Sequence, residues 1–213
     1  MNRHADTSRL ILASGSPRRS YLLHRAGIEF DVIPSRFDEN SVPQGDPMRH
    51  AGVLSRFKAQ EVSARYPQRW VLGADTIVMI GGRILGKPQN PAGARAMLEQ
   101  LSGQTHQDYT GYTICRFDSK NEFTDVVSTD VTFKTLTVSE IDWYINTGEP
   151  FDKAGAYAIQ GIGTFLVKRI NGSYTNVVGL PVCEVVEYLL KERIVPIPFG
   201  PRIDNFIETG CNQ

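Results

Sequence analysis

The segment 13–19, with the sequence ASGSPRR, places two arginines at the start of an expected helix. A helix N-terminus presents free N–H groups and the positive end of the helix dipole, so it favours anions and disfavours cations. A phosphate bound at this helix start would explain the presence of Arg18 and Arg19, because a guanidinium can bind phosphate through two hydrogen bonds. Ser14 lies in the same turn. The segment favours a phosphate site over its alternative, a capped surface helix with solvated arginines.

A single acid, Asp75, stands in an otherwise apolar stretch that runs from 71 to 80. A buried carboxylate is unfavourable unless it is paired or bound to a metal ion. Gly73 and Ala74 are small enough to let another group come close. Two interpretations stay open: a general base or metal ligand, and a structural Asp at the end of a strand.

Three charged positions depend on what the fold places beside them. Glu39 lies in an acidic loop and is either a ligand of a divalent cation or part of a solvated turn. Lys58 lies on an expected helix, where a solvated side chain is the simpler interpretation. Residues 81–87 fit G-x-x-x-x-G-K, but Pro88 stands where a P-loop needs Ser or Thr. We therefore reject a P-loop and keep Lys87 as a single phosphate contact.

A glycine-punctuated loop, 152–161, carries charged and amide groups, including Gln160, among residues too small to cover them. Such loops often line binding sites, although a structural connection explains the loop equally well. No dinucleotide-binding fingerprint, zinc spacing or nucleophilic triad is present in the sequence.

The charge balance limits what the chain can bind. Its 213 residues include 23 Lys and Arg and 23 Asp and Glu, so the formal net charge is zero. No overall field attracts the chain to nucleic acid or an anionic membrane, and a polyanion must be met by a local basic cluster. Three separated cysteines without C-x-x-C indicate reduced thiols. Without a signal peptide or a spanning segment, we expect a cytoplasmic protein.

The elements that position these residues are short strands and punctuated helices. Helices are predicted at 17–26, 47–66, 91–101, 138–148 and 182–191, and strands at 10–13, 28–33, 70–74, 76–80, 106–117, 122–136 and 164–170. The long antiparallel pair within 106–136 favours an α/β fold with a mixed β-sheet and flanking helices over a purely parallel sheet.

The motifs taken together resemble the Maf family of nucleotide pyrophosphatases. In family order they are ASGSPRR (13–19), DEN (38–40), KA (58–59), GADT (73–76), GKP (86–88), LSGQTH (101–106), DKAGAYAIQG (152–161), and NGSY and VVGLP within 171–181. On this basis 1–9 is an N-terminal extension, 10–192 a single Maf-like catalytic domain and 193–213 a C-terminal tail.

The resemblance implies an elongated, two-lobed fold with a central cleft, like that of inosine triphosphate pyrophosphatases. It implies hydrolysis of the α–β phosphoanhydride of nucleoside triphosphates to the monophosphate and pyrophosphate, with Mg²⁺ or Mn²⁺, to remove unwanted nucleotides. Arg18, Thr76 and Gln160 match the specificity positions of the branch that acts on dTTP and UTP, so these and modified pyrimidine nucleotides are the expected substrates.

The resemblance also implies a role for each site residue. Asp75 would activate water and, with Glu39, hold the metal, and the triphosphate would be bound by Ser14, Arg18, Arg19, Lys58 and Lys87. Two alternatives stay open: a pyrophosphatase of the 7-methyl-GTP branch, and a non-catalytic nucleotide-binding regulator of cell division. A homodimer is expected by resemblance alone, and no nucleic-acid or membrane partner is expected.

Overall fold

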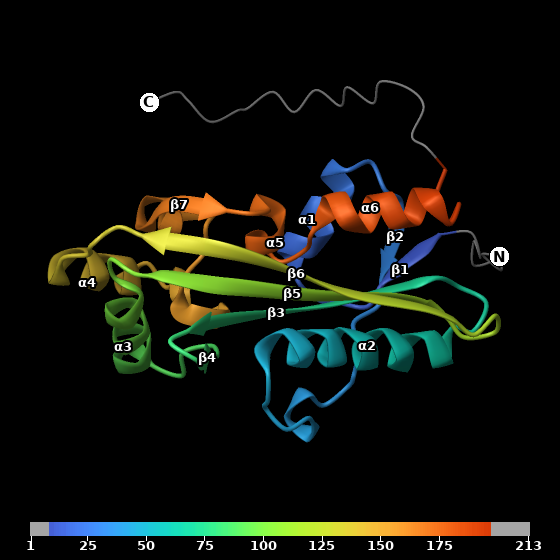
Figure 1. Ribbon diagram of the computed structural model, residues 1–213, viewed down its shortest axis with the longest axis horizontal. Helices are drawn as coiled ribbons and strands as arrows, with labels where there is room; N and C mark the ends of the chain where they lie inside the picture. Colours follow the sequence, from blue (N-terminus) through green and yellow to red (C-terminus); the bar gives the residue numbers. More distant parts are fainter. Residues whose placement is uncertain (1–8, 197–213) are drawn as a thin grey trace, which may run out of the picture.

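One mixed sheet of seven strands runs through the centre of the molecule (Figure 1). The computed structural model describes residues 9–196. The strand order is β2–β1–β3–β5–β6–β7, and β4 pairs with β3 beside this path. The strands are β1 Leu10–Leu12, β2 Phe30–Val32, β3 Val71–Ile80, β4 Arg83–Leu85, β5 Thr105–Arg116, β6 Asn121–Phe133 and β7 Val167–Asn171. Only β1 pairs in parallel, with β2 and β3, so the prediction of a mixed sheet with flanking helices is confirmed.

The helices begin where the sequence places their caps. Ser16, Asp46 and Asn90 each accept a hydrogen bond from the backbone N–H three residues later, and each is followed by proline. Thr137 and Glu140 form a capping box. The helices are α1 Pro17–Arg25, α2 Pro47–Arg65, α3 Pro91–Leu101, α4 Val138–Asn146, α5 Tyr174–Val178 and α6 Val182–Lys191.

Local differences from the predicted elements have identifiable causes. Asp75 does not interrupt a strand, because β3 continues through it with a hydrogen-bonded neighbour, β5. Residues 161–166 form 3₁₀ turns, so the strand predicted at 164–170 begins only at Val167. The Glu149 carboxylate accepts the N–H groups of Ile162 and Gly163 within these turns. The short helix α5 was not predicted.

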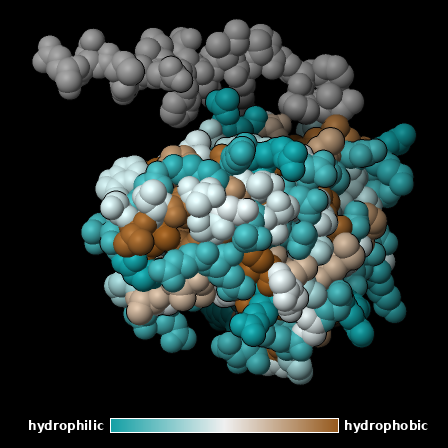
Figure 2. All heavy atoms as spheres, turned by 60° about the vertical axis from the view of Figure 1, so that its left-hand side comes forward, coloured by the Kyte–Doolittle hydropathy of each residue, from teal (hydrophilic) through white to brown (hydrophobic). Residues whose placement is uncertain are grey.

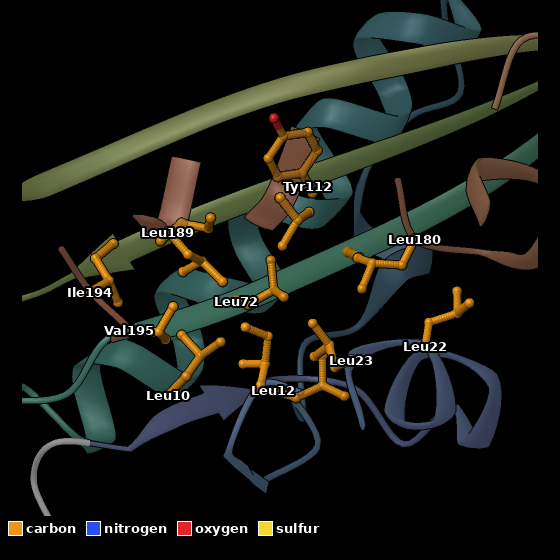
Figure 3. Packing of buried hydrophobic residues seen from close by; sticks show 14 of the residues in the cluster. Leu10, Leu12, Leu22, Leu23, Leu72, Tyr112, Leu180, Leu189, Ile194 and Val195 are labelled. Atoms are coloured by element: carbon orange, nitrogen blue, oxygen red, sulfur yellow. The ribbon is translucent and has the colours of Figure 1, made fainter. Parts of the chain in front are cut away.

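Helices cover the sheet on both faces (Figure 1). On one face, α2 packs Ala59 and Val62 against Val71. On the other, α1, α5 and α6 enclose a larger core with leucines such as Leu12, Leu23, Leu72 and Leu189 (Figure 3). A second core lies under α3 and α4 at one end of the sheet. Successive residues of β3 point to opposite faces, so Asp75 faces α2 while Thr76 faces α1 and α5.

An interruption in strand pairing along one edge of β3 creates room for a site. On that edge β1 pairs with Val71 and Leu72, and β4 pairs with Val78–Ile80. Within residues 9–196, no strand pairs with 73–77 on that edge. The chain leaves β1 at the same point and enters the 13–19 turn. Ligands of α/β proteins typically bind where neighbouring strands diverge at their carboxyl ends.

The surface gives few signs of an apolar contact area on the face drawn in Figure 2. That face is mainly hydrophilic, and its hydrophobic residues lie in small, separate patches. Across residues 9–196, none of the helices has the length and hydropathy needed to cross a membrane.

Candidate active site

A cleft of about 910 Å³ lies along the open part of β3, a size suited to a nucleotide. Every predicted site residue lines it: Ser14, Arg18, Arg19, Glu39, Lys58, Asp75, Thr76, Lys87 and Gln160. The fold thus brings together residues separated by up to 146 positions in the chain (160 − 14). Their chemical roles remain predictions, which the geometry below supports to different degrees.

The acidic side of the cleft is organised around Lys58. Its ammonium lies 2.6 Å from Asp75 Oδ1 and 2.8 Å from Glu39 Oε1. Lys58 comes from α2, and Glu39 from the 3₁₀ turn Glu39–Ser41, which Asp38 caps through its side chain. The sequence favoured a solvated surface role for Lys58, but its side chain is only 11% exposed and holds two carboxylates together.

The basic side is organised around Arg19. Its guanidinium donates to Ser14 Oγ at 3.1 Å, to Thr76 Oγ1 at 3.1 Å and to the Gly179 carbonyl at 2.8 Å. Burial lowers the pKa of Arg19, and the nearby Asp75 carboxylate opposes that shift. An arginine stays cationic under these conditions. The three contacts hold this cation at the N-terminus of α1, where an anion is also favoured by the helix dipole.

The mouth of the cleft carries a second group of charges. Arg18 Nη1 lies 3.3 Å from Asp152 Oδ2, and Lys153 Nζ lies 2.5 Å from Asp152 Oδ1. Asp152 thus occupies a position between two cations that an anionic ligand could also use. Lys87 is exposed at the rim and has no ion-pair partner among the residues that the structure describes.

The sequence analysis missed a polar stripe on the face of β5 that Thr76 shares. His106, Asp108 and Thr110 alternate along this strand, and all three are buried. Thr110 Oγ1 lies 2.9 Å from Thr76 Oγ1 and donates to the Asn176 carbonyl at 3.1 Å. The signal was available, because polar residues at every second position of an expected strand mark one polar face.

Within residues 9–196, the cleft offers a metal ion no large cluster of carboxylate or imidazole ligands. Among residues 9–196, no group of three or more His, Cys, Asp or Glu is arranged to hold a metal ion. Glu39 and Asp75 form a pair of carboxylates, and the Lys58 ammonium contacts both of them. Cys115 is buried, and burial raises its pKa to about 11, so it is not a reactive thiol. Cys183 is exposed, and Cys211 lies outside the described residues.

Comparison with known proteins assigns the chain to a protein family. Residues 9–192 match the family model described as "Maf-like protein". The chain belongs to this family. The resemblance drawn from the sequence motifs is therefore confirmed, and this Maf-like protein has relatives that are similar over most of their length.

Three of these relatives carry the same curated name, "dTTP/UTP pyrophosphatase". The protein of Syntrophus aciditrophicus is 51% identical over 183 residues, covering 86% of this chain and 89% of that protein. Those of Syntrophotalea carbinolica and Geobacter sulfurreducens are 54% and 50% identical, covering 85% and 87% of this chain and 84% and 97% of theirs. A solved structure, "Structure of a HAM1 protein from Coxiella burnetii", covers 86% of this chain and 98% of its own. At 14% identity and a TM-score of 0.42, this similarity supports no conclusion about the fold or function of this Maf-like protein.

Proposed function

We propose that this protein hydrolyses the α–β phosphoanhydride of dTTP and UTP, and of modified pyrimidine nucleotides, to give the monophosphate and pyrophosphate. One observation carries the proposal: a buried acid, Asp75, lies in the same cleft as the cations Lys58 and Arg19. The names of relatives that share 50–54% of their aligned residues with the chain support the same activity.

The cleft supplies the positive charge that a triphosphate needs. Arg19, already held by Ser14, Thr76 and Gly179, is preorganised, so it loses little side-chain entropy on binding phosphate. Arg18 and Lys87 would add charge from the mouth and the rim. For the net-neutral chain, this local cluster is the source of attraction for the nucleotide.

Asp75 would act as the general base. Its carboxylate would take a proton from a water molecule while that water's oxygen forms a bond to the α-phosphorus. The bond from the α-phosphorus to the bridging oxygen then breaks, and pyrophosphate leaves with that oxygen. Positioning and electrostatic stabilisation supply most of the rate of such transfers, and Lys58 and Arg19 would stabilise the developing charge.

The acid pair fits a divalent cation that is shared with the substrate. Mg²⁺ is commonly held by one or two carboxylates together with substrate phosphates, and Glu39 and Asp75 provide such a pair. When bound, Mg²⁺ or Mn²⁺ would neutralise phosphate charge and polarise the phosphoryl group. Because both acids now contact the Lys58 ammonium, this lysine would have to release at least one of them to such a cation.

Base selection would fall to Arg18, Thr76 and Gln160. Thr76 and Gln160 carry neutral donors and acceptors, which suit the polar edge of a pyrimidine. Thr76 already engages Arg19 and Thr110, so its hydroxyl is fixed in direction.

The test is a panel of nucleoside triphosphates with Mg²⁺, in which released pyrophosphate is detected through a coupled phosphatase. We expect dTTP and UTP to be cleaved with kcat/KM at least about tenfold above those of the purine nucleotides. Preference for 7-methyl-GTP would assign the chain to the other branch. Binding without cleavage of any nucleotide would indicate a non-catalytic regulator. The homodimer and the cytoplasmic location remain predictions.

A further inference from the structure

A buried carboxyl group in the wall of the cleft, Asp108, has no role in the proposed reaction and lacks a cationic partner. It is 1% exposed, and it lies on β5 opposite Val78 of β3. Its Oδ2 accepts a hydrogen bond from the Tyr157 hydroxyl at 2.8 Å, while its buried Oδ1 has no hydrogen-bond partner within residues 9–196. An acid held in this way is unfavourable for stability alone, which points to another use.

Tyr157 joins this acid to a buried histidine. The Tyr157 hydroxyl lies 2.9 Å from His106 Nε2 and donates its own proton to Asp108. His106 must therefore be the donor to Tyr157, so Nε2 carries the proton of a neutral ring. Burial lowers the pKa of His106 to about 4, although the charge of Asp130 on β6 opposes the shift. The chain of hydrogen bonds runs from His106 through Tyr157 to Asp108.

The other groups around these hydrogen-bonded residues do not compensate the charge of the Asp108 carboxylate. Burial raises the pKa of Asp108 to about 7, and the hydrogen bond from Tyr157 opposes that shift. Asn176 donates to the backbone carbonyl of Asp108, not to its carboxyl group. Tyr144 lies near Tyr157, and it is held by Glu149. Among residues 9–196 no lysine or arginine forms an ion pair with Asp108, and its contact with His106, at 3.6 Å, involves a neutral ring.

Tyr157 belongs to the loop that carries Gln160, and the loop is held on both sides by a tyrosine–carboxylate pair. On one side Tyr157 binds Asp108. On the other, the Tyr144 hydroxyl accepts the Ala158 N–H at 3.1 Å and donates to Glu149 at 2.9 Å. Among residues 9–196 the Gln160 side chain forms no hydrogen bond, so its position in the cleft depends on the anchors at Tyr157 and Ala158.

Although Asp108 lines the cleft, its carboxyl group is turned to the protein, because Oδ1 is buried and Oδ2 already accepts the Tyr157 hydroxyl. We propose that Asp108 is a positioning residue for base selection, which holds Tyr157 and thereby the loop that presents Gln160 to the nucleotide. This inference rests on the proposed function, because it assigns Gln160 to the base.

Two variants test the acceptor and the donor of the hydrogen bond between Tyr157 and Asp108 separately. Asp108→Asn keeps the size and an acceptor for Tyr157 but removes the ionisable group, and Tyr157→Phe keeps the ring but removes the donor. We expect each to raise KM for UTP about three- to tenfold, the effect of one hydrogen bond, with a smaller change in kcat. The preference for UTP over purine nucleotides should fall by a similar factor. Asp125→Asn, an exposed acid on β6, is the matched control and should change neither quantity.

The pH profile distinguishes positioning from a general loss of structure. An ionised acceptor forms a stronger hydrogen bond, so the wild-type KM for UTP should fall as pH rises through about 7. Asp108→Asn should lose that component, and the ionisation of the nucleotide itself is common to both proteins. Amide hydrogen exchange of residues 158–163 should quicken in both variants.

The outcomes separate the two proposals. If the wild-type protein cleaves UTP but Asp108→Asn keeps its KM, its selectivity and its pH profile, the positioning role is overturned. If the wild-type protein cleaves no nucleotide, the proposed function fails, whereas the exchange rates still decide whether Asp108 holds the loop. If Asp108→Asn fails to fold, Tyr157→Phe decides on the same measurements.

Discussion

The Lys58 ammonium lies 2.6 Å from Oδ1 of Asp75, and this contact links α2 to the middle of β3. Both side chains are 11% exposed, so the pair is shielded from water but open to the cleft. The same ammonium also binds Glu39, so one positive charge lies between two acids. The structural role of Lys58 and the proposed chemical role of Asp75 can therefore be tested separately.

Replacing Asp75 with Asn should abolish most turnover while it preserves the shape of the cleft. We expect kcat to fall at least about 10²-fold because an amide cannot accept the proton of the attacking water. Nucleotide affinity, measured by calorimetry with Mg²⁺, should change little. Asp118→Asn, on the exposed hairpin end, is the matched control and should keep full activity. Near-normal turnover of the Asp75 variant would remove this residue from its proposed role.

Replacing Lys58 with Met should leave Asp75 and Glu39 close together without a counterion. We expect the free energy of unfolding to fall by up to about 3 kcal/mol, because one buried partner of an ion pair is lost. A divalent cation should restore part of this stability by taking the position between the carboxylates, a shift that thermal unfolding with and without Mg²⁺ would measure. If Mg²⁺ stabilises the variant no more than the wild-type protein, the acid pair is not the metal site.

Gly111 lies opposite Asp75 in the β3–β5 pairing, where α2 crosses the sheet. A Cβ atom there would lie 2.3 Å from the Ala51 carbonyl oxygen, and backbone cannot move aside as a flexible side chain would. We expect Gly111→Ala to reduce stability by about 1–3 kcal/mol and to displace α2, which carries Lys58. Gly45→Ala is the control, since nothing lies within 4 Å of the added atom. Equal denaturation midpoints for the two variants would contradict this account.

The pH dependence of stability should reveal two buried groups that act in opposite directions. The pKa of His106 is about 4 in the folded chain and 6.5 as a reference, so its contribution to stability is lost as pH falls from about 6.5 to 4. The pKa of Asp108 is about 7 in the folded chain against 3.8, so its contribution is present at low pH and lost as pH rises toward 7. Between pH 4 and 6.5 the two slopes oppose each other.

The variant Asp108→Asn should therefore show the slope of His106 alone. Relative to the wild-type protein, its free energy of unfolding should fall on acidification from pH 6.5 to 4 by ~1.4 kcal/mol per pH unit at most. Urea denaturation at several pH values measures this difference. Parallel curves for the two proteins would show that Asp108 does not take up a proton on folding.

Sequence reasoning found the candidate site but not its internal contacts. The ASGSPRR turn predicted an anion site because arginines are unfavourable at a helix N-terminus without a ligand, and Asp75 was conspicuous among apolar neighbours. Lys58 could not be distinguished from a solvated helix residue. Its partner Asp75 is 17 positions away along the chain, and only the packing of α2 on β3 brings the two within contact.

The sequence by itself determined the local elements, because caps, prolines and apolar spacing act over a few residues. It therefore gave correct starts for α1, α2, α3 and α4, and the long antiparallel pair β5–β6. Only the tertiary structure decided that β1 and β4 leave 73–77 unpaired on one edge of β3, and that Glu149 binds the N–H groups of a 3₁₀ segment before β7. These outcomes depend on hydrogen-bond partners distant in the chain, and no local preference specifies such partners.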